Sequence, residues 1–240
     1  MIEFGEYSQQ ELDLLCRIAP RGGFVAEIGA NIGVHTVPLA KHVGPSGFVH
    51  AVEPQPLVFQ MLCGNLALNG LTNVDARNLG CGAKPGEVRF PDIDYSVPGN
   101  YGGIGLDQFK ETDGRRSVQI QPFDTFGCTR LDLLKIDVEG METDVLRGAE
   151  NTIRACRPVL YVENDRPENS SVLIRYIQRQ NYRIWWHLPP MFNPDNWKGH
   201  SDNPWSGLVS CNMLCIPRER PTMIKGLAEV TDPDQHPIRK

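Results

Sequence analysis

The sequence predicts an α/β fold in which a mostly parallel sheet is covered by helices on both faces. Apolar runs with the length of strands alternate with helical patterns along the chain, which is typical of parallel strands joined by crossover helices. The 240 residues suffice for one domain with a large core. A content of 40% hydrophobic and 22% charged residues is that of an ordinary globular protein.

The predicted elements follow one another in a regular order. Ser8 and Glu11 have the spacing of a capping box and place a first helix within residues 1–20. Met61 and Leu62 are expected on the apolar face of the helix over 56–69. Seven strands are expected at 24–28, 48–52, 74–79, 131–138, 158–162, 182–186 and 208–216, and further helices at 34–43, 141–155 and 172–180. We expect a single domain over 1–217, a less regular stretch over 91–119 and a polar tail over 218–240.

Charge and composition exclude several classes of partner. The formal net charge is -5, so no global positive field is available to hold a phosphate backbone, and nucleic acid is not an expected partner. No apolar run approaches the roughly 20 residues of a membrane helix, and the first ten residues lack the layout of a signal peptide. The 7 cysteines form no CxxC pair and are expected to be reduced thiols, as in a cytoplasmic protein.

A glycine turn between the first strand and its helix predicts a small-anion or nucleoside site. Gly29 permits a tight turn, and Gly33 permits close approach of a ligand or of the helix. Asn31 and Val34 occupy the second and third glycine positions of the dinucleotide fingerprint, which disfavours a pyrophosphate and suits the methionine carboxylate of S-adenosylmethionine. Glu27 is expected to accept a hydrogen bond from the loop or, through water, from the ligand. The predicted donor-binding residues here are Glu27, Gly29, Ala30, Asn31, Gly33, His35 and Thr36.

Two later strand ends extend the nucleoside site. Glu53 ends the second strand about 20 residues beyond the loop, where an acid binds ribose hydroxyls. Pro54 ends that strand, and the alternative role for Glu53 is that of a helix-cap acid before Pro56. Asn78, Leu79 and Gly80 follow the third strand, where an adenine would lie, although a turn without a ligand explains this segment equally well.

The chain resembles the FkbM-type methyltransferase family over residues 24–164. The resemblance rests on the loop over 27–33, on Glu53-Pro54 and above all on the run KIDVEGME over 135–142, and it continues through LRGA over 146–149, Arg157-Pro158 and Glu163. It implies a Rossmann-like class I methyltransferase sheet of seven strands with a terminal antiparallel hairpin. It also implies S-adenosylmethionine as methyl donor and O-methylation of a sugar, polyketide or other natural-product hydroxyl. The chain departs from the family at Gly82-Ala83, which offer no side chain to the adenine, and beyond Glu163.

The acceptor side is expected at the ends of the fourth and fifth strands. Asp137 ends the fourth strand, while Glu163 and Asn164 end the fifth. Catechol-type methyltransferases place metal ligands at these strand ends, and oxygen ligands suit Mg²⁺. Alternatively, Asp137 binds the donor amino group or the acceptor hydroxyl directly and no metal is needed. Glu139 is expected to support the turn into the next helix.

The segment after the sixth strand is a candidate acceptor loop. All 4 tryptophans lie between Trp185 and Trp205, and the loop over 188–207 is long and apolar for a loop. His187 is a candidate general base because the pKa of a histidine lies near working pH, and a structural role is its alternative.

The leading hypothesis is therefore an S-adenosylmethionine-dependent O-methyltransferase acting on a small-molecule or glycan hydroxyl. The missing glycines disfavour an NAD-dependent oxidoreductase, and a methyltransferase-like binding domain without turnover is the third candidate. The oligomeric state stays open, with a homodimer as one candidate.

Overall fold

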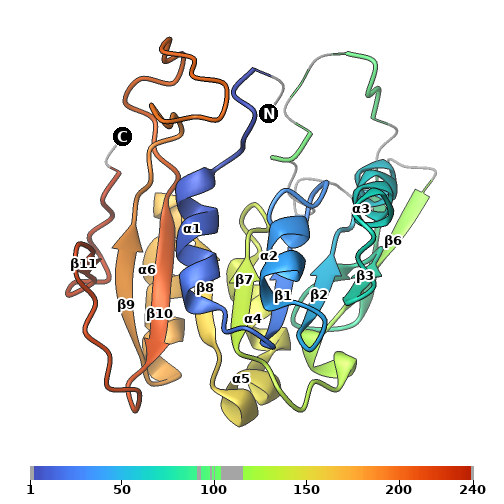
Figure 1. Cartoon of the computed structure of the whole chain (residues 1–240). Helices are drawn as coiled ribbons and strands as arrows, with labels where there is room; N and C mark the ends of the chain where they lie inside the picture. Colours follow the sequence, from blue (N-terminus) through green and yellow to red (C-terminus); the bar gives the residue numbers. More distant parts are fainter. Residues whose placement is uncertain (1–2, 91–92, 98, 100, 104–115, 239–240) are drawn as a thin grey trace.

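The computed structural model describes residues 3–90, 93–97, 99, 101–103 and 116–238. Its main sheet has the strand order β11-β9-β10-β8-β7-β1-β2-β3 (Figure 1). Strand β1 pairs in parallel with β2 and β7, and β10 is antiparallel to both β8 and β9. The predicted α/β sheet with a terminal antiparallel hairpin is confirmed. The strands are β1 (Phe24–Ile28), β2 (Phe48–Val52), β3 (Val74–Arg77), β7 (Leu133–Ile136), β8 (Val159–Glu163), β9 (Tyr182–His187), β10 (Asn212–Pro217) and β11 (Ala228–Glu229).

Helices cover both faces of this sheet, as predicted. On one face, α1 (Gln9–Ile18), α2 (Thr36–Val43) and α3 (Pro56–Leu68) pack on strand residues such as Val25 and Ala51. On the other face, α4 (Glu142–Gly148), α5 (Glu150–Cys156) and α6 (Pro167–Arg179) pack on residues such as Ala26 and Leu134 (Figure 1). The alternation of strand side chains between the two faces thus produces two apolar layers.

The helix predicted over 141–155 is divided into α4 and α5. The backbone leaves helical geometry at Ala149, with φ -110° and ψ 8°. The carboxylate of Asp124, from a distant segment, accepts the backbone N–H groups of Asn151 and Thr152 at 3.0 and 2.8 Å and so caps the new helix. Gly148 lies against the chain at Gly82, because a Cβ on Gly148 would come within 2.1 Å of the Gly82 carbonyl oxygen.

Two local expectations about the first and third helices were wrong. The Ser8 side chain caps no backbone N–H, and its hydroxyl instead donates to the Glu11 carboxylate at 2.7 Å. Met61 is 47% exposed, while the buried face of α3 carries Val58, Leu62 and Leu66. Because α3 is apolar around much of its circumference, contacts with the rest of the fold decide which face is buried. The sequence pattern alone did not identify that face.

The structure adds strands that the sequence pattern did not reveal. Strands β4 (Gly80–Cys81), β5 (Gly86–Phe90) and β6 (Arg116–Gln121) form a small second sheet of order β4-β6-β5, followed by a 3-10 helix, η2 (Phe123–Phe126). The end of the stretch predicted to be irregular, residues 116–119, thus belongs to a strand. The segment predicted as a polar tail contributes β11, which pairs with β9 and gives the main sheet an eighth strand. None of the helices that the structure describes combines the length and the apolarity needed to cross a membrane.

Candidate active site

A cavity of about 380 Å³ opens at the carboxyl ends of β1, β2 and β7. This is where ligands bind in open α/β sheets, since the helices that cover the two faces diverge there. The cavity brings together most of the predicted site residues: Glu27, Gly29, Ala30, Asn31, His35, Glu53, Pro54, Leu79, Gly80, Asp137 and Glu163 all line it. Five predicted residues are not part of its lining, namely Gly33, Thr36, Asn78, Asn164 and His187.

The turn after β1 depends on the absence of a side chain at Gly29. Gly29 has φ +87°, and a Cβ there would lie 1.8 Å from the carbonyl oxygen of Asp137. Asn31 also has a positive φ, 50°, and its Oδ1 accepts the N–H of Ile32 at 2.8 Å. A Cβ at Gly33 would lie 2.8 Å from Leu62, so this glycine lets α3 approach the loop. Strand β7 and the glycine turn therefore form one rigid wall of the cavity.

Glu53 is positioned by the backbone on both sides of its carboxylate. It is 4% exposed, and it accepts the N–H groups of Asn31 at 2.9 Å and Gln55 at 2.8 Å. Gln55 directly precedes α3, so Glu53 also fills the cap-like role that was its alternative. Burial raises the pKa of Glu53 to about 7, and these two hydrogen bonds only partly oppose it. The residue thus changes charge near neutral pH while facing the cavity.

Asn78 joins strand ends instead of lining the cavity. Its side-chain nitrogen donates to the carbonyl oxygens of Glu53 and Pro54, both at 2.9 Å. Leu79 and Gly80, which follow it, line the cavity together with Cys81. Asn78 therefore holds the end of β2 in place, and its neighbours supply the apolar surface predicted for a base.

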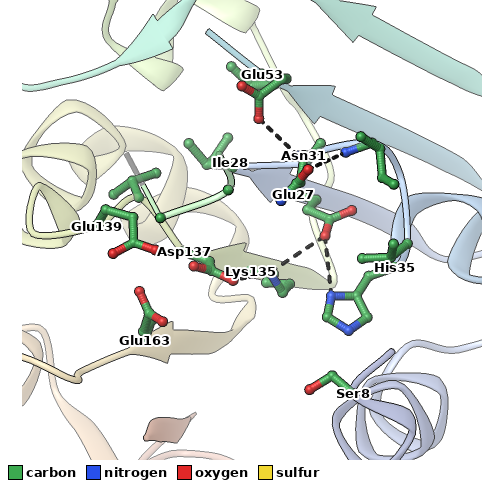
Figure 2. A pocket seen from close by; sticks show the side chains of 18 of the residues that line it. Ser8, Glu27, Ile28, Asn31, His35, Glu53, Lys135, Asp137, Glu139 and Glu163 are labelled. Carbon is green, nitrogen blue, oxygen red and sulfur yellow. Dashed lines mark hydrogen bonds and ion pairs between the residues drawn. The ribbon is translucent and has the colours of Figure 1, made fainter. Parts of the chain in front are cut away.

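A buried ionic network lies under the glycine turn (Figure 2). Lys135, only 2% exposed, places its ammonium 2.9 Å from Asp137 and 3.5 Å from Glu27. Glu27 also accepts the hydroxyl of Thr36 at 2.5 Å and lies 3.7 Å from the Nδ1 of His35. Burial is the largest single influence on both groups and favours their neutral forms, but the Lys135 ammonium, His35 and the side-chain hydrogen bonds together outweigh it and lower the pKa of both Glu27 and Asp137. Both carboxylates are therefore ionised at neutral pH.

Three carboxyl groups form an acidic wall beside this network. One oxygen from each of Asp137, Glu139 and Glu163 lies within 4.8 Å of the others. Burial raises the pKa of Glu163 well above its ordinary value, and the negative charge of Asp137 raises it further. Burial also raises the pKa of Glu139, which pairs with Arg166 at 3.2 Å. The wall thus combines an ionised group, Asp137, with a neighbour that holds a proton, Glu163.

The predicted metal-ligand set of Asp137, Glu163 and Asn164 is not brought together. Asn164 is 3% exposed, and its side-chain nitrogen donates to Ser170 at 2.9 Å. The backbone N–H of Asn164 donates to the carbonyl oxygen of Cys211 at 2.7 Å, so the pairing of β8 with the chain before β10 continues through this residue. Its side chain therefore contacts the interior beside α6. Lys135 and Arg166 already balance the charges of Asp137 and Glu139. Asn164 therefore does not join Asp137 and Glu163, whose carboxylates lie together with that of Glu139 instead.

His187 does not face the cavity. Its Nδ1 lies 2.8 Å from the hydroxyl of Tyr161, a residue that is completely buried within the core under α1. Partial burial lowers the pKa of His187, whose ring lies at the edge of this core. The structure therefore supports the structural alternative for this residue and gives it no contact with a ligand in the cavity.

The outer wall of the cavity comes from three separated segments. Tyr7 precedes α1, Met191 belongs to the predicted acceptor loop, and Cys211 precedes β10. Trp197 is 78% exposed, and Trp205 packs on Phe4 with ring centroids 5.1 Å apart; neither tryptophan lines the cavity. The loop over 188–207 thus reaches the cavity through Met191 and not through its tryptophans.

Sequence reasoning missed the cavity roles of Lys135, Glu139, Tyr7 and Met191. The sequence did contain a signal for the role of Lys135. A charged residue interrupts an otherwise apolar strand there, and it shares one face of the strand with Asp137 two positions later. In the sheet it stands opposite Glu27 on one neighbouring strand and Tyr161 on the other. Met191 lies in the loop that was predicted to form the acceptor side, although the sequence did not single this residue out. Tyr7 had no signal, because only the folded chain brings the segment before α1 to the cavity.

A sheet with this strand order and a ligand cavity at a glycine turn defines the class of Rossmann-like nucleoside-binding folds. A family model described as the methyltransferase FkbM domain matches residues 27–184, which is more than half of the chain. The chain therefore belongs to the FkbM methyltransferase domain family. The resemblance inferred from the run over 135–142 is confirmed.

Individual proteins agree with this assignment. The chain is 28% identical over 152 residues to Methyltransferase 1 of Beauveria bassiana, an alignment covering 55% of this chain and 60% of that protein. It is 28% identical over 165 residues to Methyltransferase sdnD of Sordaria araneosa, covering 55% of this chain and 62% of that protein. Each alignment thus spans about three fifths of the relative. The crystal structure of Methyltransferase FkbM from Methylobacillus flagellatus has a similar fold, with a TM-score of 0.55 and 20% identity, covering 80% of this chain and 43% of that one.

Proposed function

We propose that the protein transfers a methyl group from S-adenosylmethionine to a hydroxyl oxygen of a small natural product, such as a sugar or polyketide. The observation that carries this proposal is the cavity in which Gly29, Glu53 and Asp137 converge, within a chain of the FkbM methyltransferase domain family. A hydroxyl acceptor is the part of the proposal that rests on the family resemblance.

The residues of the cavity fit this donor. The Gly29 turn leaves room for a ligand backbone, and Glu53 retains free lone pairs for ribose hydroxyls after accepting two N–H groups. Leu79 and Gly80 offer a surface for adenine, and Asp137 offers an ionised oxygen for the donor amino group. S-adenosylmethionine, when bound, supplies a methyl group already activated on a sulfonium. The protein therefore needs mainly to align the acceptor, exclude water and remove one proton.

Glu163 is the group proposed to remove the acceptor proton, in place of His187. It lines the cavity beside Asp137, whereas His187 does not. Because burial raises the pKa of Glu163, its carboxylate is a stronger base than an ordinary one once it has lost its proton. Asp137 holds this group in place and orients the hydroxyl. Since turnover would need Glu163 ionised, kcat/KM for the acceptor at saturating donor should rise with pH in the wild type, and the part of this rise that depends on Glu163 should vanish in Glu163→Gln.

No metal step is part of the proposal, because Asn164 does not join the predicted ligand set, and Lys135 and Arg166 already pair with Asp137 and Glu139. Turnover should consequently survive EDTA, and loss of turnover that Mg²⁺ restores would contradict this. Asp137→Asn should still reduce turnover on the order of tenfold or more, since the negative oxygen at the donor–acceptor junction is lost. Full turnover and normal donor affinity in Asp137→Asn would remove Asp137 from the mechanism.

Two measurements test the function itself. Calorimetric titration should show binding of S-adenosylhomocysteine and none of NAD, whereas the opposite result would support an oxidoreductase. Incubation with methyl-labelled donor and a panel of sugars, polyketides and phenols should then give a labelled O-methyl product. A chain that binds S-adenosylhomocysteine but methylates no acceptor in such panels would support a binding domain without turnover. The acceptor wall is proposed to include Tyr7 and Met191, with the loop over 188–207 as its outer support.

A further inference from the structure

His35 is a buried histidine with one nitrogen left without a partner. The residue is 2% exposed, directly precedes α2 and lines the cavity. Its Nδ1 faces Glu27 at 3.7 Å, and its Nε2 is buried without a hydrogen-bond partner among the residues that the structure describes. Leaving a buried polar atom unpaired costs roughly 1–3 kcal/mol. Because His35 lines the cavity, a ligand group that binds beside it could supply this missing partner.

The surroundings of His35 favour an anionic partner. Glu27, on the Nδ1 side, is already balanced by Lys135 and by the hydroxyl of Thr36. Helix α2 begins at the next residue, and the amino end of a helix carries partial positive charge. When Nε2 carries a proton, it can donate a hydrogen bond to a ligand on that side, and a carboxylate is the strongest acceptor for such a bond. The Nε2 side therefore suits a carboxylate.

The positions of the charged groups match the two ends of an amino acid. Figure 2 shows Asn31 and Glu27 between Glu53 and His35, with Asp137 and Glu163 on a separate side of the cavity. The acidic wall would repel a carboxylate and attract an ammonium, whereas the His35 side does the reverse. A ligand with its ribose at Glu53 would extend its amino-acid end across the glycine turn toward these two sides.

We propose that His35 recognises the methionine carboxylate of the donor through Nε2 and is thus the residue that distinguishes the complete donor from analogues without that group. This inference rests on the proposed function, since it assumes an S-adenosylmethionine site in the cavity. It assigns His35 a role in recognising the ligand and none in proton removal.

The test compares two ligands that differ only in the carboxylate. The affinities of S-adenosylhomocysteine and of its decarboxylated analogue, with hydrogen in place of the carboxylate, are measured by calorimetry. The wild type should bind S-adenosylhomocysteine about tenfold to a hundredfold more tightly, as for a charged hydrogen bond. His35→Ala should lose this preference while binding the analogue almost as the wild type does. His35→Gln, whose amide can donate one N–H, should keep part of the preference.

Control variants and contrary outcomes separate this inference from the proposed function. His187→Ala removes a histidine outside the cavity and should leave the preference intact. An unchanged preference in His35→Ala, or an equal loss for both ligands, would overturn the role of His35 while leaving the donor site standing. If His35→Ala does not fold, the same two ligands are compared in His35→Gln. A preference for S-adenosylhomocysteine equal to that of the wild type in this variant would contradict the proposed role of His35. A wild type that binds neither ligand would instead overturn the proposed function itself.

Discussion

At the scale of single residues, Glu53 combines two roles that the sequence presented as alternatives. Its carboxylate accepts N–H groups from the glycine loop and from the residue before α3, so it organises the backbone. It also lines the cavity, where the same oxygens face the proposed ribose position. The residue that we propose to bind the ribose thereby also stabilises the loop that lines the cavity.

The first prediction is that donor affinity depends on pH through Glu53. Burial raises its pKa to about 7 in the free protein, and two ribose hydroxyls donate more strongly to its ionised form, in which both oxygens are acceptors. Binding below about pH 7 must therefore release a proton, so affinity should fall as pH decreases, by up to about tenfold per unit. Above about pH 8 the affinity should be constant. Calorimetry with S-adenosylhomocysteine at pH 6, 7 and 8 measures this.

The control for this prediction is Glu53→Ala. It should bind S-adenosylhomocysteine about 1–3 kcal/mol more weakly at pH 8, because charge-assisted hydrogen bonds are lost. Its affinity should also lack the component of the pH dependence that the wild type shows near pH 7. Identical pH profiles for the two proteins, or an unchanged affinity of the variant, would remove Glu53 from the donor site.

The second prediction concerns Lys135, the buried cation between Glu27 and Asp137. Lys135→Met leaves two carboxylates without their main compensating charge in the interior. Breaking a buried ion pair by removing one partner costs about 3–5 kcal/mol. The free energy of unfolding in urea should fall by that order, and Glu27→Gln combined with Lys135→Met should recover part of the loss. A single variant as stable as the wild type would mean that water already solvates these carboxylates.

At the scale of elements, the glycine turn and the end of β7 form one unit. Gly29 belongs to the first βα connection, yet the atom that excludes a side chain there is the carbonyl oxygen of Asp137, more than 100 residues later. The two neighbouring parallel strands thus set the position of Asp137 relative to the donor loop. Catalytic geometry here depends on strand pairing and not on a local motif alone.

The third prediction follows from two glycines with similar backbone angles. Gly44 has φ +75°, and no atom lies within 4 Å of the point that a Cβ would occupy there, whereas a Cβ on Gly29 at φ +87° meets Asp137. Because ψ of Gly44 is -174°, a backbone region that is essentially restricted to glycine, Gly44→Ala should cost about 1–3 kcal/mol through backbone strain alone. Gly29→Ala adds a backbone clash and should cost on the order of 3 kcal/mol or more and weaken donor binding. Urea unfolding of both variants measures the difference, and equal losses would contradict the close approach.

At the scale of the whole molecule, the carboxyl-terminal segment over 218–238 adds the last strand of the main sheet. It also contacts the backbone that follows β8, next to the cavity residue Glu163. Strand β11 pairs with β9, and Val230, just beyond it, is 7% exposed. Further along, His236 contacts the carbonyl oxygen of Asn164 at 2.8 Å, and Asp234 pairs with Arg175 at 2.6 Å. The backbone after β8, which follows Glu163, is therefore held by residues more than 60 positions later.

The fourth prediction tests whether this segment contributes to global stability. Val230→Ala should lower the free energy of unfolding by about 1–2 kcal/mol, since buried methyl groups are lost and a small cavity is left. Met223→Ala in the same segment is the matched control, because Met223 is 80% exposed and should change stability by less than about 0.5 kcal/mol. Equal effects of the two substitutions would show that the segment does not pack as described.

The sequence by itself determined the order of most strands of the main sheet and the chain positions of the candidate donor-binding residues. Apolar periodicity marks β1, β2 and β7, and short-range turn chemistry marks Gly29 at the end of one strand and Glu53 at the end of another. These signals are local, because a strand end or a tight turn is encoded by a few adjacent residues. Parallel strands then bring their carboxyl ends to one edge, so Glu27, Glu53 and Asp137 meet as predicted.

Only the tertiary structure decided which side chains reach the cavity from elsewhere. Asn164 follows Glu163 directly but bonds to Ser170, and His187 ends a strand but contacts Tyr161. Lys135 lies in a strand whose apolar sequence predicts a buried core strand, yet its ammonium forms ion pairs with both Glu27 and Asp137. The direction of each side chain depends on the neighbours that occupy the adjacent space, and these neighbours come from distant parts of the chain. A pattern of adjacent residues carries no information about them.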